Sequence, residues 1–373
     1  MQQIYSALNK LMKAWTKLRF KSFRLLSLIL LGREGGQAIV GISTMSDLEF
    51  ANNKSVRDMI QDRKLLSEAE VQEYNCLSVP DCWRTMFSRC TAFPRRFAYI
   101  LKDVVVGPDS GVVHTDRVCG GAIFVQSVGS INFLFQWGIQ EVMRRAITID
   151  CDAPICPMPN IGYYHDLFEG LIRVVKARHT FKNVKVLVAE CRPRYIDEML
   201  SAIGVQNDQI IEASSPVLVR SAVLIPRWAD SGENLKEDVI ELRDSLRTRL
   251  SDALPSDDKI YISRIKSRRP LANERGIEKI LASKGFKVVY FEDISFRKQL
   301  QIIYAAKVIV APHGAALANI IVAKRGAKVI ELMTQDYANS CYGHIASSLG
   351  LDYVCLDADD SSFIEQIEMF INN

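Results

Sequence analysis

The stretch 307–333 constrains the fold of this chain more than any other part of the sequence. Val308–Ala311 is a short β-branched run, and a helix pattern of small and apolar residues then covers Gly314–Ala323. A second apolar run, Lys328–Leu332, comes next. A strand, a helix and a strand in this order are typical of a parallel sheet. The turn before the helix would present backbone N–H groups at the sheet edge, where Gly314 adds no side chain, and such a place suits a phosphate.

The same alternation continues through the C-terminal part of the chain. Strands are predicted at Lys259–Ser263, Phe286–Phe291 and Tyr353–Leu356, and helices at Asn273–Ser283, Ser295–Ala306, Asn339–Leu349 and from Ser361 onward. These elements predict a second α/β half that is built on a parallel sheet.

The sequence pattern of residues 97–228 predicts a first half of mixed α/β character, with short strands. Strands are expected at Tyr99–Val106, Gly111–Thr115, Gly121–Gln126, Ala146–Asp150, Val184–Ala189, Gln209–Glu212 and Ser221–Pro226, and helices at Tyr163–Ala177 and near Pro193. Polar residues 229–258, with a charged helix at Leu235–Leu250, are interpreted as the connection to the second half. A chain of 373 residues is long enough for about two domains. We therefore expect α/β domains at 95–228 and 229–373 with a cleft between them.

The first 94 residues are predicted to form a helical extension. Residues 1–31 carry six Lys/Arg and no Asp or Glu, and their apolar residues recur at helical spacing. Such a basic amphipathic helix fits the surface of an anionic membrane, and it also fits docking on the protein's own body. Its uncharged run, Leu25–Gly32, is too short to span a bilayer. Residues 34–94 contain a predicted helix from about Ser46 to Tyr74, and no chemistry is assigned to them.

Composition excludes several classes of protein. The hydrophobic content of 48% and the charged content of 24% are those of a soluble globular protein. A net charge of +4, from 47 basic and 43 acidic residues, is too balanced to indicate a nucleic-acid binder. The nine cysteines are scattered, without a C-x-x-C pair or metal-ligand spacing, which favours a reduced compartment such as a bacterial-type cytoplasm.

Basic residues gather where the first strand of the second half ends. Ser263 and Arg264 close that strand, and Lys266, Arg268 and Arg269 follow within a few positions. Because ligands bind beyond the carboxyl ends of parallel strands, this cluster should lie near the turn at His313 and Gly314. Guanidinium groups beside a helix start form a diphosphate site. The alternative is a solvated surface loop, which is the commoner role of an arginine-rich stretch.

Three further residues of the second half are candidates with open alternatives. His313 could donate to a phosphate or stabilise a leaving group, or it could simply cap the helix. Glu331, at the end of the next strand, could accept hydrogen bonds from ribose hydroxyls or form a structural ion pair. Asn319, farther along the helix, fits a brace for the loop better than a ligand contact.

In the first half, the run from Asn160 to Glu169 is the notable one. His165 and Glu169 are four residues apart, so on a helix they share a face and could act as a base and the group that orients it. The alternative is a polar helix start, with Asp166 near its positive end.

These pieces, in this order, resemble glycosyltransferase family 61, a family that includes bacterial capsular polysaccharide enzymes, plant xylan transferases and animal N-acetylglucosaminyltransferases. The resemblance covers roughly residues 97–370. It is carried by Tyr164-His165 with Leu167-Phe168-Glu169, Tyr261-Ile262-Ser263-Arg264, Arg269 with Asn273-Glu274, Gly285-Phe286, Ser295 with Gln299, Pro312-His313-Gly314-Ala315 with Leu317 and Asn319, and Val329-Ile330-Glu331-Leu332. The chain departs from the bacterial pattern at Asp166, where an aromatic residue is usual, and at Ile172, where proline is usual.

The resemblance implies a GT-B architecture, in which two Rossmann-like domains face a cleft, and a transfer that inverts the sugar carbon without an obligatory metal or other cofactor. The C-terminal domain would bind a nucleotide diphosphate sugar through Ser263, Arg264, Arg269, Asn273, His313, Gly314, Ala315, Asn319 and Glu331. The N-terminal domain would bind a glycan or lipid-linked glycan acceptor. His165, oriented by Glu169, would be the general base, with Asp166 as the competing carboxylate.

The implied role is synthesis of a capsule, exopolysaccharide or lipopolysaccharide, in the cytoplasm or at the inner face of the cytoplasmic membrane. One alternative is a nucleotide- or sugar-binding protein of the same fold without turnover. Another is a metal-dependent transferase using Asp150 and Asp152, which follow a hydrophobic strand. An unrelated dinucleotide enzyme is disfavoured, because no G-x-G-x-x-G follows a strand.

Overall fold

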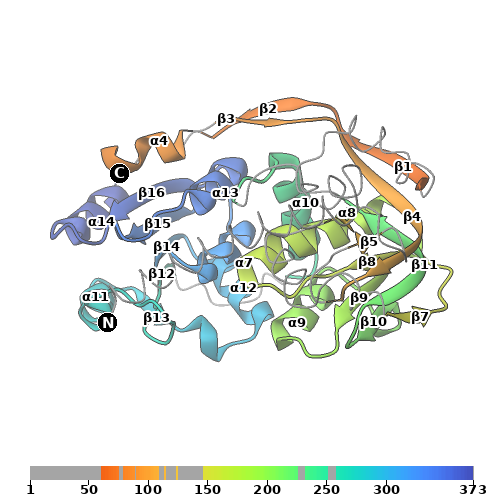
Figure 1. Cartoon of the computed structure of the whole chain (residues 1–373). Coiled ribbons are helices and arrows are strands. Elements are labelled where there is room, and N and C mark those ends of the chain that lie inside the picture. Colours follow the sequence, from red (N-terminus) through yellow and green to blue (C-terminus); the bar gives the residue numbers. More distant parts are fainter. Residues whose placement is uncertain are drawn as a thin grey trace, which may run out of the picture.

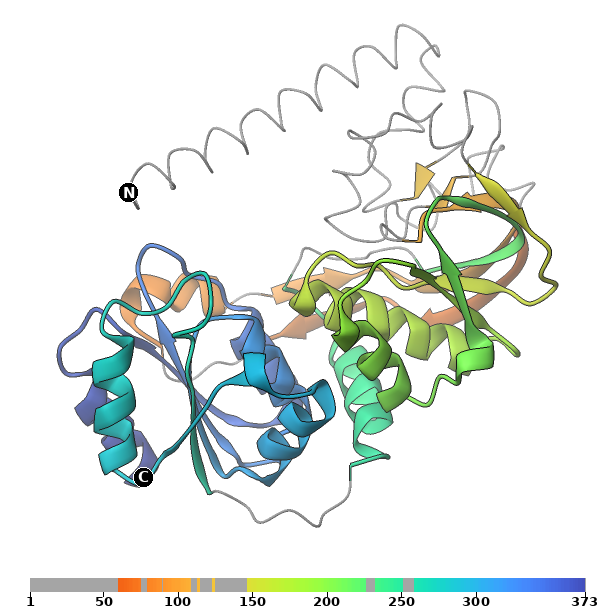
Figure 2. The same cartoon turned by 90° about the horizontal axis from the view of Figure 1, so that it is seen from below.

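The computed structural model describes residues 60–74, 79–88, 90–108, 113–114, 123–124, 146–225, 232–250 and 258–372. Within these ranges the fold is mixed α/β, with two sheets that lie side by side and a small strand pair that reaches across both (Figures 1 and 2). The predicted α/β class is therefore confirmed.

The C-terminal sheet is parallel, with the strand order β13–β12–β14–β15–β16. Its strands are β12 (Lys259–Ile262), β13 (Lys287–Val289), β14 (Val308–Pro312), β15 (Lys328–Met333) and β16 (Asp352–Asp357). The chain leaves β12 for β13 on one side and then returns to β14 on the other side. In open sheets of this kind, ligands bind at such a reversal, in the crevice outside the carboxyl ends of the two strands, which here are β12 and β14.

Helices cover both faces of this sheet, as alternation along its strands requires. In β14, Val308 and Val310 pack with α11 (Glu274–Ser283) and α14 (Phe363–Asn372), whereas Ile309 and Ala311 face the opposite core. On that opposite side lie α12 (Phe296–Ala305), the 3-10 helix η5 (Ala315–Val322) and α13 (Cys341–Leu349).

The N-terminal sheet mixes parallel and antiparallel pairs, in the order β10–β9–β8–β11–β4–β5–β6, with β1 also on β4 and β7 also on β11. Its strands are β1 (Ile60–Ser67), β4 (Arg96–Val106), β5 (Val113–His114), β6 (Ile123–Phe124), β7 (Ile147–Ile149), β8 (Ile155–Pro157), β9 (Lys185–Ala189), β10 (Ile210–Ala213) and β11 (Val217–Leu224). One long helical segment, α7 (Tyr163–His165), η2 (Asp166–Leu171) and α8 (Ile172–Thr180), packs on it beside α9 (Arg194–Ala202).

The helix predicted from about Ser46 to Tyr74 is wrong over its described part. Residues 60–67 form β1, which pairs antiparallel with β4, and Glu70–Glu73 form β2, which pairs with β3 (Cys90–Phe93). The open side of β4 supplies backbone partners, and this pairing outweighs the helix propensity of the segment. Residues 1–31, with their predicted basic helix, lie outside the described residues.

The segment from β2 to β3 joins the two halves (orange in Figure 1). It includes η1 (Asp81–Trp83) and α4 (Arg84–Phe87), and the ring of Phe87 lies 6.1 Å from that of Tyr353 on β16. Trp83 and Phe87 belong to one continuous hydrophobic core that contains residues of both sheets. The two halves therefore pack as one body around this core.

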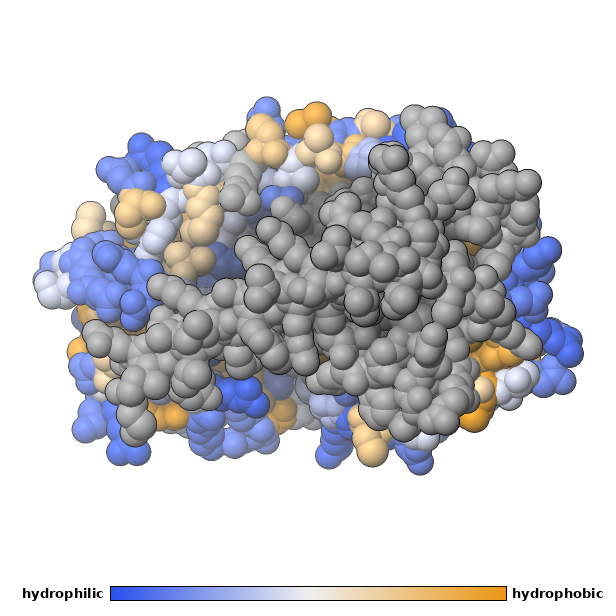
Figure 3. All heavy atoms as spheres, in the orientation of Figure 1, coloured by the Kyte–Doolittle hydropathy of each residue, from blue (hydrophilic) through white to orange (hydrophobic). Residues whose placement is uncertain are grey.

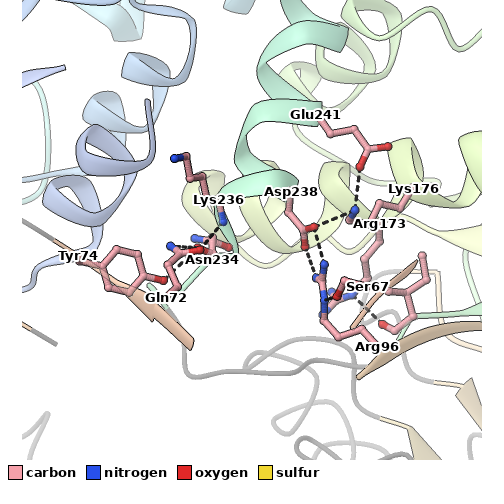
Figure 4. A network of polar contacts seen from close by, with 11 residues as sticks. Ser67, Gln72, Tyr74, Arg96, Arg173, Lys176, Asn234, Lys236, Asp238 and Glu241 are labelled. Atoms are coloured by element: carbon pink, nitrogen blue, oxygen red, sulfur yellow. Dashed lines mark hydrogen bonds and ion pairs between the residues drawn. The ribbon is translucent and has the colours of Figure 1, made fainter. Parts of the chain in front are cut away.

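Helix α10 (Lys236–Arg247), which was predicted to lie in a linker, packs within this body and connects elements of it. Asp238 of α10 accepts two hydrogen bonds from Arg96 of β4, at 2.6 and 3.0 Å, and pairs with Lys176 of α8 at 2.8 Å (Figure 4). Ion pairs this well buried and hydrogen-bonded fix the relative position of the elements that carry them.

The surface seen in Figure 3 is mostly hydrophilic over the described residues of the C-terminal half. Hydrophobic residues form small separate groups in this view, one of them at the top, in the region of β2 and β3. Val71 of β2 is 68% exposed. In the part of the chain that the structure describes, no helix has the length and apolar character that a membrane span requires.

Candidate active site

The crevice beyond β12 and β14 brings together the basic loop and the histidine turn that the sequence predicted as neighbours. Tyr261 of β12 is in register with Val310 of β14, so the residues after each strand meet at one edge. There the guanidinium of Arg264 donates a hydrogen bond to the backbone carbonyl of His313. A Cβ on Gly314 would lie 2.6 Å from the guanidinium carbon of Arg264. Glycine at this position therefore leaves room for the arginine.

Two cations at this edge lack a described carboxylate partner. Neither Arg264 nor Arg269 forms an ion pair with any residue of the described ranges. Burial lowers the pKa of Arg264, and the nearby charge of Arg269 lowers it further. The guanidinium of Arg269 lies 4.1 Å from the ring centre of Tyr337. Two like charges held close together without neutralisation are an arrangement that attracts an anion.

A buried carboxylate shapes the loop that carries Arg264. One oxygen of Glu274 accepts hydrogen bonds from Tyr261 Oη at 2.7 Å, from Ser263 Oγ at 3.2 Å and from the Arg264 backbone N–H at 2.9 Å. Ser263 is 1% exposed, so its hydroxyl bonds inside the protein and helps to hold the shape of the loop. Asn273 is the residue before α11, and its side chain makes no capping hydrogen bond. No role for Glu274 was predicted from the sequence. Its position as an acidic residue in the first turn of α11 is the feature that could have indicated one.

His313 is held by a second buried carboxylate. Its Nδ1–H donates to Oε1 of Glu331, and the hydroxyl of Tyr353 donates to Oε2 of the same residue. Glu331 is fully buried, with both oxygens engaged. This geometry fits a brace for His313 rather than the predicted contact with a ribose.

The helical segment of the first half that contacts the second half through Tyr163 also carries His165 and Glu169. Nδ1 of His165 lies 2.9 Å from Oε1 of Glu169, and the imidazole is about a third exposed whereas the carboxylate is buried. The turn between them, Asp166–Leu171, is π-helical, a distortion frequent at functional sites. The predicted pairing of these two side chains is therefore present, in the geometry of a base and the group that orients it.

The side chain of Asp166 bonds to groups other than His165 and Glu169. Its oxygens accept hydrogen bonds from the backbone N–H of Ile161 at 2.8 Å, from that of Gly162 at 3.2 Å and from Tyr195 Oη at 2.8 Å. The residue is fully buried, and burial raises its pKa. These contacts fit a structural brace at the helix start, which was the alternative to a competing catalytic carboxylate.

Two sets of contacts join the helix at Tyr163 to the second half. The hydroxyl of Tyr163 lies 2.7 Å from Oδ1 of Asn319 and 3.0 Å from Oε1 of Gln299, to which Asn319 also donates at 2.8 Å. Asn319 is fully buried, and its contacts with Tyr163 and Gln299 hold η5 against α7 and α12.

The second set is aromatic and runs between the two histidines. Tyr164 stacks edge-on against His165 and against Tyr342 of α13, with ring centres 5.6 and 5.8 Å apart. Tyr342 in turn lies 5.2 Å from His313, which also contacts Tyr337 at 5.2 Å. His165 and His313 therefore belong to one continuous row of rings that crosses the boundary between the halves.

The alternative metal site lies away from this row. Asp150 and Asp152 are exposed at the edge of the N-terminal sheet, and Arg220 pairs with them at 2.8 and 3.0 Å. Across the described residues, no group of three or more His, Cys, Asp and Glu side chains is arranged to hold a metal ion.

A comparison with protein families gives a match for part of the chain. Residues 163–330, from the first residue of α7 into β15, match the model of the family described as Glycosyltransferase 61. No curated protein matches the chain.

Proposed function

Because residues 163–330 match the model of glycosyltransferase family 61, we propose that the chain transfers a sugar from a nucleotide diphosphate sugar to a hydroxyl group of a glycan acceptor, with inversion at the sugar carbon. The proposal takes the crevice beyond β12 and β14 as the donor site. It takes the helix that begins at Tyr163 as the acceptor side.

One observation carries the donor site: Arg264 and Arg269 lie without carboxylate partners, among the described residues, beside the Gly314 turn. A leaving nucleotide diphosphate gains negative charge as the bond to the sugar breaks. Fixed guanidinium groups and the backbone N–H groups at Ala315 would stabilise that charge. In this proposal they do the work that a metal ion does in other transferases.

The chemistry on the acceptor side needs one base. Inversion is a single displacement, so a base must take the proton of the acceptor hydroxyl as its oxygen attacks from the face opposite the diphosphate. His165 is partly exposed and its Nδ1 pairs with Glu169, so in this proposal Nε2 is the ring nitrogen that receives the proton. Glu169 would stabilise the imidazolium that results.

The finer parts of the proposal follow from the resemblance and the fold. The arrangement is GT-B-like, with residues 95–228 on the acceptor side and residues 229–373 binding the donor. The product is a cell-surface polysaccharide, and residues 1–31 hold the enzyme at the cytoplasmic face of the membrane. A binding protein without turnover is the second candidate, because the same crevice could hold a nucleotide sugar without transfer.

A thermal-shift screen of nucleotide diphosphates and nucleotide sugars tests the donor site, since a ligand that binds the native state raises its melting temperature by mass action. The selected donor is then offered to glycan acceptors in excess chelator. We expect selective stabilisation and retained transfer. Transfer that chelator abolishes would favour the Asp150 and Asp152 alternative, and binding without transfer to any acceptor would favour the second candidate.

A further inference from the structure

Tyr342 occupies the middle of the row of rings between His165 and His313. It is 3% exposed and lies in the first turn of α13, which begins after β15 at the same edge of the sheet as Arg264. Its ring contacts Tyr164 from the first half and His313 from the second. Tyr342 therefore contacts residues on both sides of the boundary between the two halves.

The hydroxyl of Tyr342 has no hydrogen-bond partner within the described ranges, unlike the other tyrosines beside it. The hydroxyl of Tyr164 accepts from Asn234, that of Tyr353 donates to Glu331, and that of Tyr74 donates to the carbonyl of Asn234. The ring of Tyr342 is buried, but its hydroxyl oxygen is not among the fully buried polar atoms that lack a partner in the described residues, so this oxygen keeps some exposed surface at which a ligand could bond to it.

The charges around Tyr342 indicate what this hydroxyl would bind. Burial raises the pKa of Tyr342 well above its usual value, Glu331 acts in the same direction, and Arg264 acts to lower it. The phenol therefore stays protonated at neutral pH and can donate a hydrogen bond. It lies within electrostatic reach of Arg264, the cation proposed to hold the diphosphate, and the positive end of α13 adds to the attraction for an anion.

We infer that the Tyr342 hydroxyl is a ligand group of the donor site and donates a hydrogen bond to a phosphate oxygen of the bound diphosphate. The inference rests on the proposed function for the identity of the diphosphate. It adds to the basic loop and the His313 turn a third binding element, which comes from α13.

The test compares Tyr342→Phe with Tyr74→Phe. Both variants keep a buried ring next to α13, because Tyr74 stacks on His344 with ring centres 4.0 Å apart, but only Tyr74 has a described hydrogen bond to lose. Melting temperature is measured without ligand, and affinity is measured for inorganic pyrophosphate and for the nucleotide diphosphate that stabilises the wild type. Tyr342→Phe should melt like the wild type and bind both ligands roughly 10- to 100-fold more weakly, the loss expected for a hydrogen bond to a charged group. Tyr74→Phe should melt earlier and bind them normally.

Each other outcome has a definite meaning. Unchanged affinity in Tyr342→Phe would overturn the inference, and so would a fall in its melting temperature equal to that of Tyr74→Phe, which would reveal a partner within the protein. If pyrophosphate binding depends on Tyr342 but no nucleotide sugar is bound or used, the inference stands and glycosyl transfer fails. If the wild type binds no diphosphate at all, both fail.

Discussion

At the scale of single residues, the site is defined by which charges are neutralised and which are left available. Glu274 and Glu331 are buried and engaged by backbone and side-chain donors, whereas Arg264 and Arg269 have no carboxylate partner among the described residues. The buried carboxylates therefore shape the loops, and the two cations keep no described carboxylate partner. This division separates residues that position the site from residues that would touch a ligand.

Replacement of Arg264 by alanine tests that division. Arg264→Ala should weaken binding of nucleotide diphosphates roughly 10- to 100-fold, because it removes a charge-assisted contact to the anion. Arg268→Ala is the matched control, since Arg268 belongs to the same loop and is exposed. Calorimetry measures the affinity of each variant for nucleotide diphosphates. Equal affinity in Arg264→Ala and the wild type would exclude this loop as the donor site.

The proposed base makes a different prediction. His165→Ala should lower the rate of transfer by roughly 100- to 10,000-fold, the usual contribution of a general base, while affinity for the donor stays unchanged. Glu169→Gln should have a smaller effect on the same rate, because it removes the charge that orients and stabilises the imidazole. His179→Ala, on the exposed end of α8, is the control. Full activity in His165→Ala would show that another residue is the base.

At the scale of elements, the second half follows directly from the sequence. Each strand there is a short apolar run that is followed by a helix with its own stop signal, so the parallel alternation and the convergence of Arg264 with His313 were both predictable. The first half was less readable. Strand β8 is three residues long and lies between prolines, and β1 owes its conformation to pairing with β4.

Roles that depend on contacts between distant elements were not predictable. Asp238 of α10 binds Arg96 and Lys176, which lie in different elements, and nothing in the local sequence marks it. Glu331 was predicted to contact a ligand because it ends a strand at the correct edge. Its burial against Tyr353 depends on the pairing of β15 with β16, which the local sequence does not show.

The contact between α7 and η5 supports a prediction about stability. Asn319→Ala would leave the buried polar groups of Tyr163 and Gln299 with fewer partners, so we expect a loss of roughly 2–3 kcal/mol in the free energy of unfolding. Gln301→Ala on α12, whose side chain has no described hydrogen bond, should cost less than about 0.5 kcal/mol. Denaturant unfolding measures both values. Equal stability of the two variants would show that the Asn319 contacts do not hold the halves together.

At the scale of the whole molecule, the two halves share one hydrophobic core, and the segment from β2 to β3 crosses both of them (Figure 2). A site assembled from both halves in this way depends on their fixed relative position, which the core, the Asp238 ion pairs and the Asn319 contacts all maintain.

Deletion of residues 1–31 separates membrane attachment from catalysis. Their six Lys/Arg and absence of Asp and Glu predict electrostatic attraction to anionic lipid, worth about 1 kcal/mol for each basic residue near the surface. The full chain should therefore sediment with vesicles that contain anionic lipid, less so at high salt and not with neutral vesicles, whereas the truncated chain should stay in solution. The truncated chain should keep its affinity for nucleotide diphosphate, because Arg264, Arg269 and Tyr342 all lie in the remaining body. Vesicle binding that survives the deletion would refute the anchor, and loss of nucleotide affinity together with a lower melting temperature would show that these residues dock on the protein instead.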